Sequence, residues 1–263
     1  MRPSAFCNES KAQRLAHEII DSYGLREPDE IDLEAIALDQ GVDVRYAPLV
    51  GCEARLVRLG DRGIVTVDHS HGLTGRTRFS VAHELGHWNM HQHINQFWRC
   101  SNANIFRYDG APEELEANAF AAELIMPTAM IRPQVREGSL GFGLVDTLSA
   151  KFRASLTATA LRCVSELNEP AAVVLSDQNR IIWSWRNSHV QSWQFAIKKG
   201  ACLGEQTKAW CTAESQGHEE MTVVPTDAWF PDHPTHWKVE TWEASRFLQG
   251  FGTVLSLLTV NEY

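Results

Sequence analysis

The sequence predicts an α+β protein in three parts: a domain of mixed helices and strands (1–127), a helical middle segment (128–168) and a mostly-β C-terminal α+β domain (169–263). Two observations lead to this division. Apolar residues recur with helical spacing through the first two parts, interrupted only by short alternating runs, whereas alternating runs dominate the last part. The segment Asn168-Glu169-Pro170 marks the change between the two patterns.

The elements of the first part follow from apolar spacing and capping residues. Residues 10–23 place apolar side chains on one face of a helix, which Gly24 closes. Asp32 can cap a second, short helix that extends to Leu38. Three runs of strand character follow, at 42–46, 55–59 and 63–67. The last two flank a Gly-Asp-Arg-Gly turn, which predicts a hairpin.

The middle segment, 128–168, is predicted to be helical, with a break at 153–155 that resembles the turn of a helix-turn-helix pair. A DNA-recognition helix needs cations that read base edges, but the second helix of this pair has none before Arg162. The pattern therefore favours packing or substrate docking over DNA reading.

The last part is predicted to form strands near 171–175, 180–185, 222–224, 237–241 and 252–260. Seven of the nine tryptophans fall within it. Trp183 and Trp185 are two residues apart and so share one face of a strand, where they line either a core or a pocket.

The main chemical signal is the run His83-Glu84-Leu85-Gly86-His87, which reads HExxH. Residues four apart lie on one face of a helix, so His83 and His87 can both aim a ring nitrogen at one metal ion about 2 Å away. Glu84 then lies beside the metal, where it can take a proton from water and pass it to a leaving amine. Because Gly costs about 1 kcal/mol relative to Ala inside a helix, Gly86 predicts a close neighbour. Helices on a small sheet, followed by this motif helix, are the zincin-like arrangement, and the motif predicts a zinc hydrolase.

Two residues compete for the position of the third protein ligand. His93 has the spacing of the HExxHxxGxxH enzymes, but those need a glycine where this chain has Met90, a good helix former. His91 and His93 are therefore expected along or just past the helix end, solvated or stabilised by the helix dipole. The second candidate, Glu114, opens a strongly helical stretch that Pro127 ends.

The helix that carries Glu114 has small residues at 117, 119, 121 and 122, which allow it to lie close to the motif helix. Glu114 and Asn118 share one face, so Glu114 can complete a zinc site of two histidines and one glutamate. Asn118 can accept a hydrogen bond from a ligand imidazole. Glu113 and Glu116 point elsewhere on the helix and are expected in solvent.

Cys100 lies between the two helices in the sequence. A thiolate is a strong zinc ligand and can fill the fourth position, which would hold the enzyme inactive until it is displaced. The alternative is a small buried or loop cysteine without such a role.

Composition limits the classes of function. The chain has 263 residues and a net charge of −9, which argues against a constitutive duplex-DNA binder. It has no apolar run long enough to span a membrane and no signal-peptide pattern at its start. Its six cysteines form no CxxC pair, so we expect a cytoplasmic protein with reduced thiols.

HELGH followed by E-x-E-A-N-x-F-A-A-E-L-I-M-P resembles the ImmA/IrrE family of metallo-endopeptidases. The similarity extends upstream to residues 32–37, to 41–44 and to the Arg78-Phe79 approach to the motif, and covers roughly residues 10–165. It implies a zincin-like fold and a protease that cleaves a helix-turn-helix transcriptional repressor. Such cleavage would derepress stress, phage-defence or mobile-element genes.

The resemblance also assigns the site residues and a role for the last domain. It implies Zn²⁺ ligands at His83, His87 and Glu114 and a general base at Glu84, and the chain matches the family at all four positions. Some relatives carry a GAF-like sensory domain after the helical segment. A small-molecule or single-stranded nucleic-acid activator that binds this domain is therefore a hypothesis.

The sequence thus predicts a zinc-dependent endopeptidase with a repressor as its substrate. Two other functions remain open. One is a non-proteolytic zinc-binding regulator that sequesters its repressor partner, which the intact Glu84 opposes. The other is a DNA-binding regulator built around residues 145–167, which the net charge opposes.

Overall fold

The computed structural model describes residues 9–70, 72–91, 97–100 (backbone only), 111–189, 196–233 and 238–262. The chain divides into two compact units. The N-terminal unit comprises 1–130 and 148–155, and the C-terminal unit comprises 131–147 and 156–263. A boundary between domains at residue 127 and another at 168 stay predictions. No helix in the described ranges is both long enough and apolar enough to cross a membrane.

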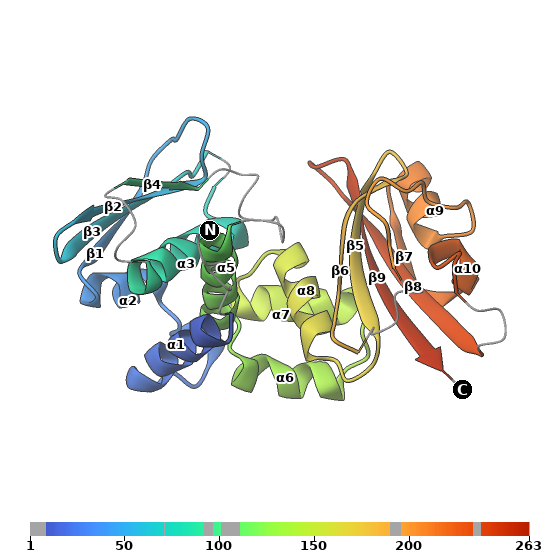
Figure 1. Cartoon of the computed structure of the whole chain (residues 1–263), viewed down its shortest axis with the longest axis horizontal. Coiled ribbons are helices and arrows are strands. Elements are labelled where there is room, and N and C mark those ends of the chain that lie inside the picture. Colours follow the sequence, from blue (N-terminus) through green and yellow to red (C-terminus); the bar gives the residue numbers. More distant parts are fainter. Residues whose placement is uncertain are drawn as a thin grey trace, which may run out of the picture. The chain divides into compact units, whose positions relative to one another are not determined.

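The N-terminal unit combines helices with a four-stranded sheet (Figure 1). Its main elements are α1 (Glu9–Ser22), α2 (Leu33–Asp39), β1 (Val42–Tyr46), β2 (Ala54–Leu59), β3 (Arg62–Val67), α3 (Gly75–Met90), β4 (Phe97–Cys100) and α5 (Pro112–Ile125). The α+β class and the zincin-like arrangement predicted from the sequence are confirmed.

Local sequence explains how the first elements begin and end. Gly24 follows α1 with a φ of 66°, a left-handed conformation that costs glycine little. The Asp32 carboxylate accepts a hydrogen bond from the Ala35 backbone N–H at 3.0 Å and so caps α2. At the start of α3, the Thr77 hydroxyl accepts the Thr74 N–H at 3.1 Å. The end of α1 and the start of α2 therefore agree with the predictions made from Gly24 and Asp32.

The sheet of this unit has the strand order β1-β3-β2-β4. β1 pairs with β3 in parallel, whereas β2 pairs antiparallel with both β3 and β4. The three predicted strands and their hairpin are confirmed. β4 was not predicted, because a four-residue run without clear alternation becomes a strand only through its pairing with β2.

Helix α3 lies against the sheet, and its first residue has no room for a side chain. A Cβ on Gly75 would lie 2.3 Å from the Ala154 carbonyl carbon and 2.4 Å from the Ser155 nitrogen. Both contacts are with backbone atoms, which cannot move aside as a flexible side chain can. The turn at 153–155 therefore packs directly on the N-terminus of α3, within the same compact unit.

We expect Gly75→Ala to destabilise the protein by about 1–3 kcal/mol, the usual range for overpacking. Gly143 is a matched control, since it also lies in the first turn of a helix but a Cβ there would meet no atom within 4 Å. Gly143→Ala should be neutral or stabilise by about 0.4–1 kcal/mol. Urea unfolding followed by circular dichroism measures both changes. Equal stability of the two variants would contradict the packing described for Gly75.

The C-terminal unit contains helices and a five-stranded antiparallel sheet. The remaining elements of the chain are α6 (Thr128–Glu137), α7 (Phe142–Phe152), α8 (Leu156–Glu166), β5 (Ala171–Asp177), β6 (Arg180–Arg186), α9 (Lys208–Ser215), β7 (His218–Val224), α10 (Thr226–Trp229), β8 (Val239–Leu248) and β9 (Thr253–Glu262). The helical middle segment, with its break at 153–155, and the C-terminal sheet are confirmed.

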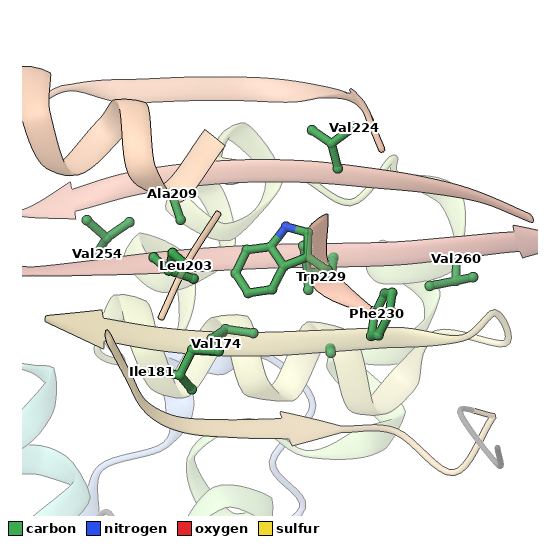
Figure 2. Packing of buried hydrophobic residues seen from close by; sticks show 11 residues of the cluster. Val174, Ile181, Leu203, Ala209, Val224, Trp229, Phe230, Val254 and Val260 are labelled. Carbon is green, nitrogen blue, oxygen red and sulfur yellow. The ribbon is translucent and has the colours of Figure 1, made fainter. Parts of the chain in front are cut away.

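The sheet of the C-terminal unit has the order β6-β5-β9-β8-β7 and carries helices on both faces. Helices α9 and α10 cover one face, and α8 packs against β5 and β6 on the other (Figures 1 and 2). Figure 2 shows the core beneath α9 and α10, where Trp229 and Phe230 lie among aliphatic side chains of β5, β6, β7 and β9. Trp183 and Trp185 are half-buried, so a core or a pocket role for them stays open.

Helices α9 and α10 were not predicted, and a buried carboxylate explains part of their position. Glu243 of β8 is fully buried and accepts hydrogen bonds from the backbone N–H groups of Lys208 and Ala209, at 2.9 and 2.6 Å. It also accepts from the Trp229 indole at 2.7 Å and from the Ser245 hydroxyl at 2.8 Å. This one side chain ties both helices to the sheet, a link that no local pattern reveals.

Burial raises the pKa of Glu243 above its usual range. A carboxyl group with a raised pKa binds its proton more tightly in the folded state, so its contribution to stability is lost as pH rises above about 4.5 and through the folded-state pKa. We expect the free energy of unfolding of the wild type to fall relative to that of Glu243→Gln over this range. Urea unfolding followed by tryptophan fluorescence measures the difference at each pH. If the free energy of unfolding of the wild type instead rose relative to that of Glu243→Gln as pH increases, the raised pKa of Glu243 would be contradicted.

Candidate metal centre

Two helices, α3 and α5, bring the predicted site residues together. They pack so closely that a Cβ on Gly86 would lie 3.0 Å from the Ala117 Cα. The close neighbour predicted from Gly86 is therefore confirmed, and it lies on α5. Ala117 and Ala121 are fully buried small residues on that helix. Larger side chains there would hold the helices apart and would separate the residues that they carry.

His83, His87 and Glu114 converge at this interface. The Nε2 atoms of the two histidines are 3.1 Å apart, and Glu114 carboxylate oxygens lie 3.3 Å from His83 Nε2 and 3.6 Å from His87 Nε2. All three side chains are buried, and they form a group that can hold a metal ion. No other group of this kind occurs among the described residues.

The spacing of these atoms fits zinc. Ligand atoms at about 2.0–2.1 Å from a tetrahedral ion are separated by about 3.3 Å from one another. The two histidine nitrogens are 3.1 Å apart, and each has a Glu114 oxygen at a similar distance, Oε2 at 3.3 Å from His83 and Oε1 at 3.6 Å from His87. Two imidazoles and a carboxylate are also the donors found in catalytic zinc sites that keep one position open.

Asn118 lies behind the first histidine, with its Oδ1 2.9 Å from His83 Nδ1. An amide oxygen only accepts hydrogen bonds, so His83 Nδ1 carries the proton and Nε2 presents its lone pair to the site. The pKa of His87 lies well below its usual range, because the ring is buried beside His83 and His91. A neutral ring is the form that binds a metal.

Glu84 follows His83 on α3 and is completely buried. Its place next to a converging ligand suits a group that exchanges protons with a water molecule held in the site. Neither its burial nor the separations of the converging atoms could be read from the sequence. Helical spacing predicted only that Glu84 lies beside the ligand histidines.

Two sequence predictions about this region were wrong. His91 follows the last residue of α3, as predicted, but its side chain is not solvated, because it is buried and lies between His87 and α5. Glu116 was expected in solvent, but its carboxylate lies 3.0 Å from His91 Nε2, within hydrogen-bond distance. Both were misjudged because α5 covers the last turn of α3. The signal available in the sequence was the regular spacing of four between His83, His87 and His91.

Two further sequence predictions fall on residues whose side chains lie outside the described part of the chain. These are the inhibitory role of Cys100 and the position of His93. For Cys100, only the backbone is described, as the last residue of β4. Both assignments stay predictions.

Comparison with known proteins agrees with the geometry of the site. Residues 37–164 match a peptidase family model described as the IrrE N-terminal-like domain. Among solved structures, the chain is similar to a Mycobacterium tuberculosis transcriptional regulator, with 14% identity and a TM-score of 0.61. The similarity covers 95% of this chain and 87% of that chain, and at this identity it shows a shared fold alone. No curated protein matches significantly. The matched residues hold the HExxH helix and the converging glutamate, and they form an IrrE N-terminal-like peptidase domain, which confirms the resemblance to the ImmA/IrrE family over this part of the chain.

Proposed function

We propose that this protein is a zinc-dependent endopeptidase that cleaves a helix-turn-helix transcriptional repressor in the cytoplasm. The observation that carries the proposal is the convergence of His83, His87 and Glu114 beside the buried Glu84. A site built only to stabilise the fold would close all four zinc positions with protein ligands. Among the described residues, three ligands converge with a carboxylate at their side, and this is the pattern of a hydrolytic site.

Each residue of the site would have a separate role in hydrolysis. A zinc ion bound by His83, His87 and Glu114 would supply Lewis acidity and lower the pKa of a coordinated water to about 7. Glu84 would take a proton from the attacking water and return it to the leaving amine. Asn118 would hold the His83 ring in the tautomer that ligation needs.

The substrate segment would bind in extended form along β4. Among the described strands, β4 ends the sheet order beside β2, so its outer edge can present backbone N–H and C=O groups to a peptide. A flexible or locally unfolded region of the repressor would satisfy this requirement, whereas a packed helix would not. Backbone pairing of this kind positions the scissile bond without strong dependence on side chains.

Resemblance to the ImmA/IrrE family supports a repressor as the substrate. The name of the similar Mycobacterium tuberculosis protein, a transcriptional regulator, also supports a role in gene control. We further propose that the C-terminal unit binds an activator, either a small molecule or single-stranded nucleic acid. Trp183 and Trp185, half-buried on β6, give a fluorescence readout for titration with nucleotides and short single-stranded DNA. Unchanged fluorescence with every ligand would contradict the activator proposal.

The test is incubation of the purified protein with the product of the neighbouring repressor gene. We expect two fragments in the presence of stoichiometric zinc, none after chelation and recovery when zinc is restored. Mass spectrometry of the fragments gives the cleaved bond. An intact repressor, with zinc bound to the enzyme and candidate activators present, would contradict proteolysis. Loss of repressor binding to its operator without cleavage would instead indicate sequestration.

A further inference from the structure

His91 is the first residue after α3 and lies one helical turn beyond His87. Its side chain is buried, and its two ring nitrogens have different partners. The Nδ1 atom lies 2.9 Å from His87 Nδ1, and the Nε2 atom lies 3.0 Å from a carboxylate oxygen of Glu116. A continuous chain of contacts therefore runs from Glu116 of α5 through His91 to the far side of the His87 ring.

The chemistry of the partners fixes where the protons lie along this chain. A carboxylate can only accept hydrogen bonds, so Glu116 requires a proton on His91 Nε2. In a neutral His91 the Nδ1 atom then carries a lone pair. Two lone pairs at 2.9 Å would repel, so His87 must supply the proton from its own Nδ1. The Nε2 atom of His87 is left with a lone pair.

The nitrogen selected in this way is the one that faces the other ligands. His87 Nε2 lies 3.1 Å from His83 Nε2 and 3.6 Å from Glu114. At His83 the Asn118 oxygen accepts the Nδ1 proton, so this ring also presents a lone pair from Nε2. Two Nε2 lone pairs 3.1 Å apart would repel, so both rings hold this tautomer together only when a cation lies between them. The two ligand rings therefore have the same tautomer but different partners. The partner of His83 is the Asn118 amide, and that of His87 is the His91–Glu116 pair.

We propose that His91 and Glu116 are positioning residues that hold His87 in the tautomer and ring orientation required to bind zinc. The inference rests on the proposed function, because it takes His87 as a zinc ligand. Partners that orient a ligand histidine typically contribute about 10–100-fold to metal affinity. His91 contacts His87 directly, whereas Glu116 acts through His91, so the two substitutions should have effects of the same kind but not of the same size.

The first experiment reads the protons directly in the zinc-loaded wild type. Two-dimensional ¹H–¹⁵N spectra of the histidine rings distinguish Nδ1–H from Nε2–H tautomers. We expect His87 to carry its proton on Nδ1 and His91 on Nε2, with assignments from single His→Gln substitutions at other histidines. A proton on His91 Nδ1 would overturn the inference, because His91 could then not accept the His87 Nδ1 proton, and this readout requires no substrate.

The second experiment measures zinc affinity by competition with a chromophoric chelator. We expect His91→Phe and Glu116→Ala to weaken zinc binding by about tenfold or more. Glu116→Gln should stay close to wild type, since its amide oxygen can accept the same proton from His91. Glu113→Ala is the matched control, because it removes the same charge from the same helix and the Glu113 side chain has no hydrogen bond or ion pair with the described residues.

The outcomes separate the inference from the proposed function. Wild-type affinity in both His91→Phe and Glu116→Ala would overturn the positioning role while leaving the zinc site intact. Equal losses in Glu116→Gln and Glu116→Ala would also overturn it, since a tautomer lock needs an acceptor and not a charge. If the wild type itself binds no zinc, the proposed function fails, and the inference fails with it.

Discussion

Glu84→Gln should lower the rate of repressor cleavage by about 10²–10⁴-fold, the usual contribution of a general acid–base group. The amide has nearly the same shape as the carboxylate, but it cannot take a proton from water. Zinc content should stay at the wild-type level, because Glu84 is not among the three side chains that converge on the metal position. Cleavage kinetics and elemental analysis on the same preparation test both halves of this prediction.

The control for this variant is Glu113→Gln, which makes the same chemical change on α5. It should cleave at the wild-type rate, because Glu113 is not one of the converging residues. A Glu84→Gln enzyme within tenfold of wild type would mean that another group acts as the base. A cleavage-deficient Glu84→Gln protein that still releases the operator would favour sequestration of the repressor over its hydrolysis.

Glu114→Ala should weaken zinc binding by more than about 100-fold. Loss of a partner that only orients a ligand costs about 10–100-fold, and loss of a ligand itself should exceed that range. Cleavage should fall with zinc occupancy, and excess zinc should restore part of it. Affinity measured by chelator competition, with Glu113→Ala beside it, tests the assignment.

Glu114→Asp refines this test, since it keeps the carboxylate but shortens its reach by one methylene. We expect an affinity between those of the wild type and Glu114→Ala. The carboxylate of Glu114 lies 3.3 and 3.6 Å from the two histidine nitrogens, so a shorter side chain would hold it farther from the metal position and weaken its bond to zinc without removing the charge. Unchanged affinity in both Glu114 variants would show that another residue completes the site.

The parts of the site that the sequence predicted are those fixed by local geometry. His83, Glu84 and His87 follow from helical spacing, because a period of 3.6 residues determines which side chains share a face. Glu114 required one long-range step, the packing of two helices, and the small residues of α5 supplied the signal for it. The capped helices and the hairpin of β2 and β3 were predictable for the same local reasons.

The features that the sequence did not reveal depend on contacts between distant segments. His91 and Glu116 are 25 positions apart in the sequence. Taken singly, neither residue has a sequence context that distinguishes it from a solvated surface residue. Helices α9 and α10 are positioned partly by Glu243, which lies far along the chain from α9. A charged residue within a strand pattern suggests a solvated position, and only the folded chain shows four donors around it.

The packing of Ala154 and Ser155 on Gly75 has a consequence for how the peptidase can be divided from the rest of the chain. Residues 148–155 belong to the compact unit that holds the metal centre, although they follow it by more than twenty positions. Arg153 adds a hydrogen bond from its guanidinium to the Ile31 carbonyl, at 3.2 Å. A fragment that stops soon after α5 would lose this cover and expose the first turn of α3. The shortest expression fragment that retains these contacts must therefore extend past Ser155.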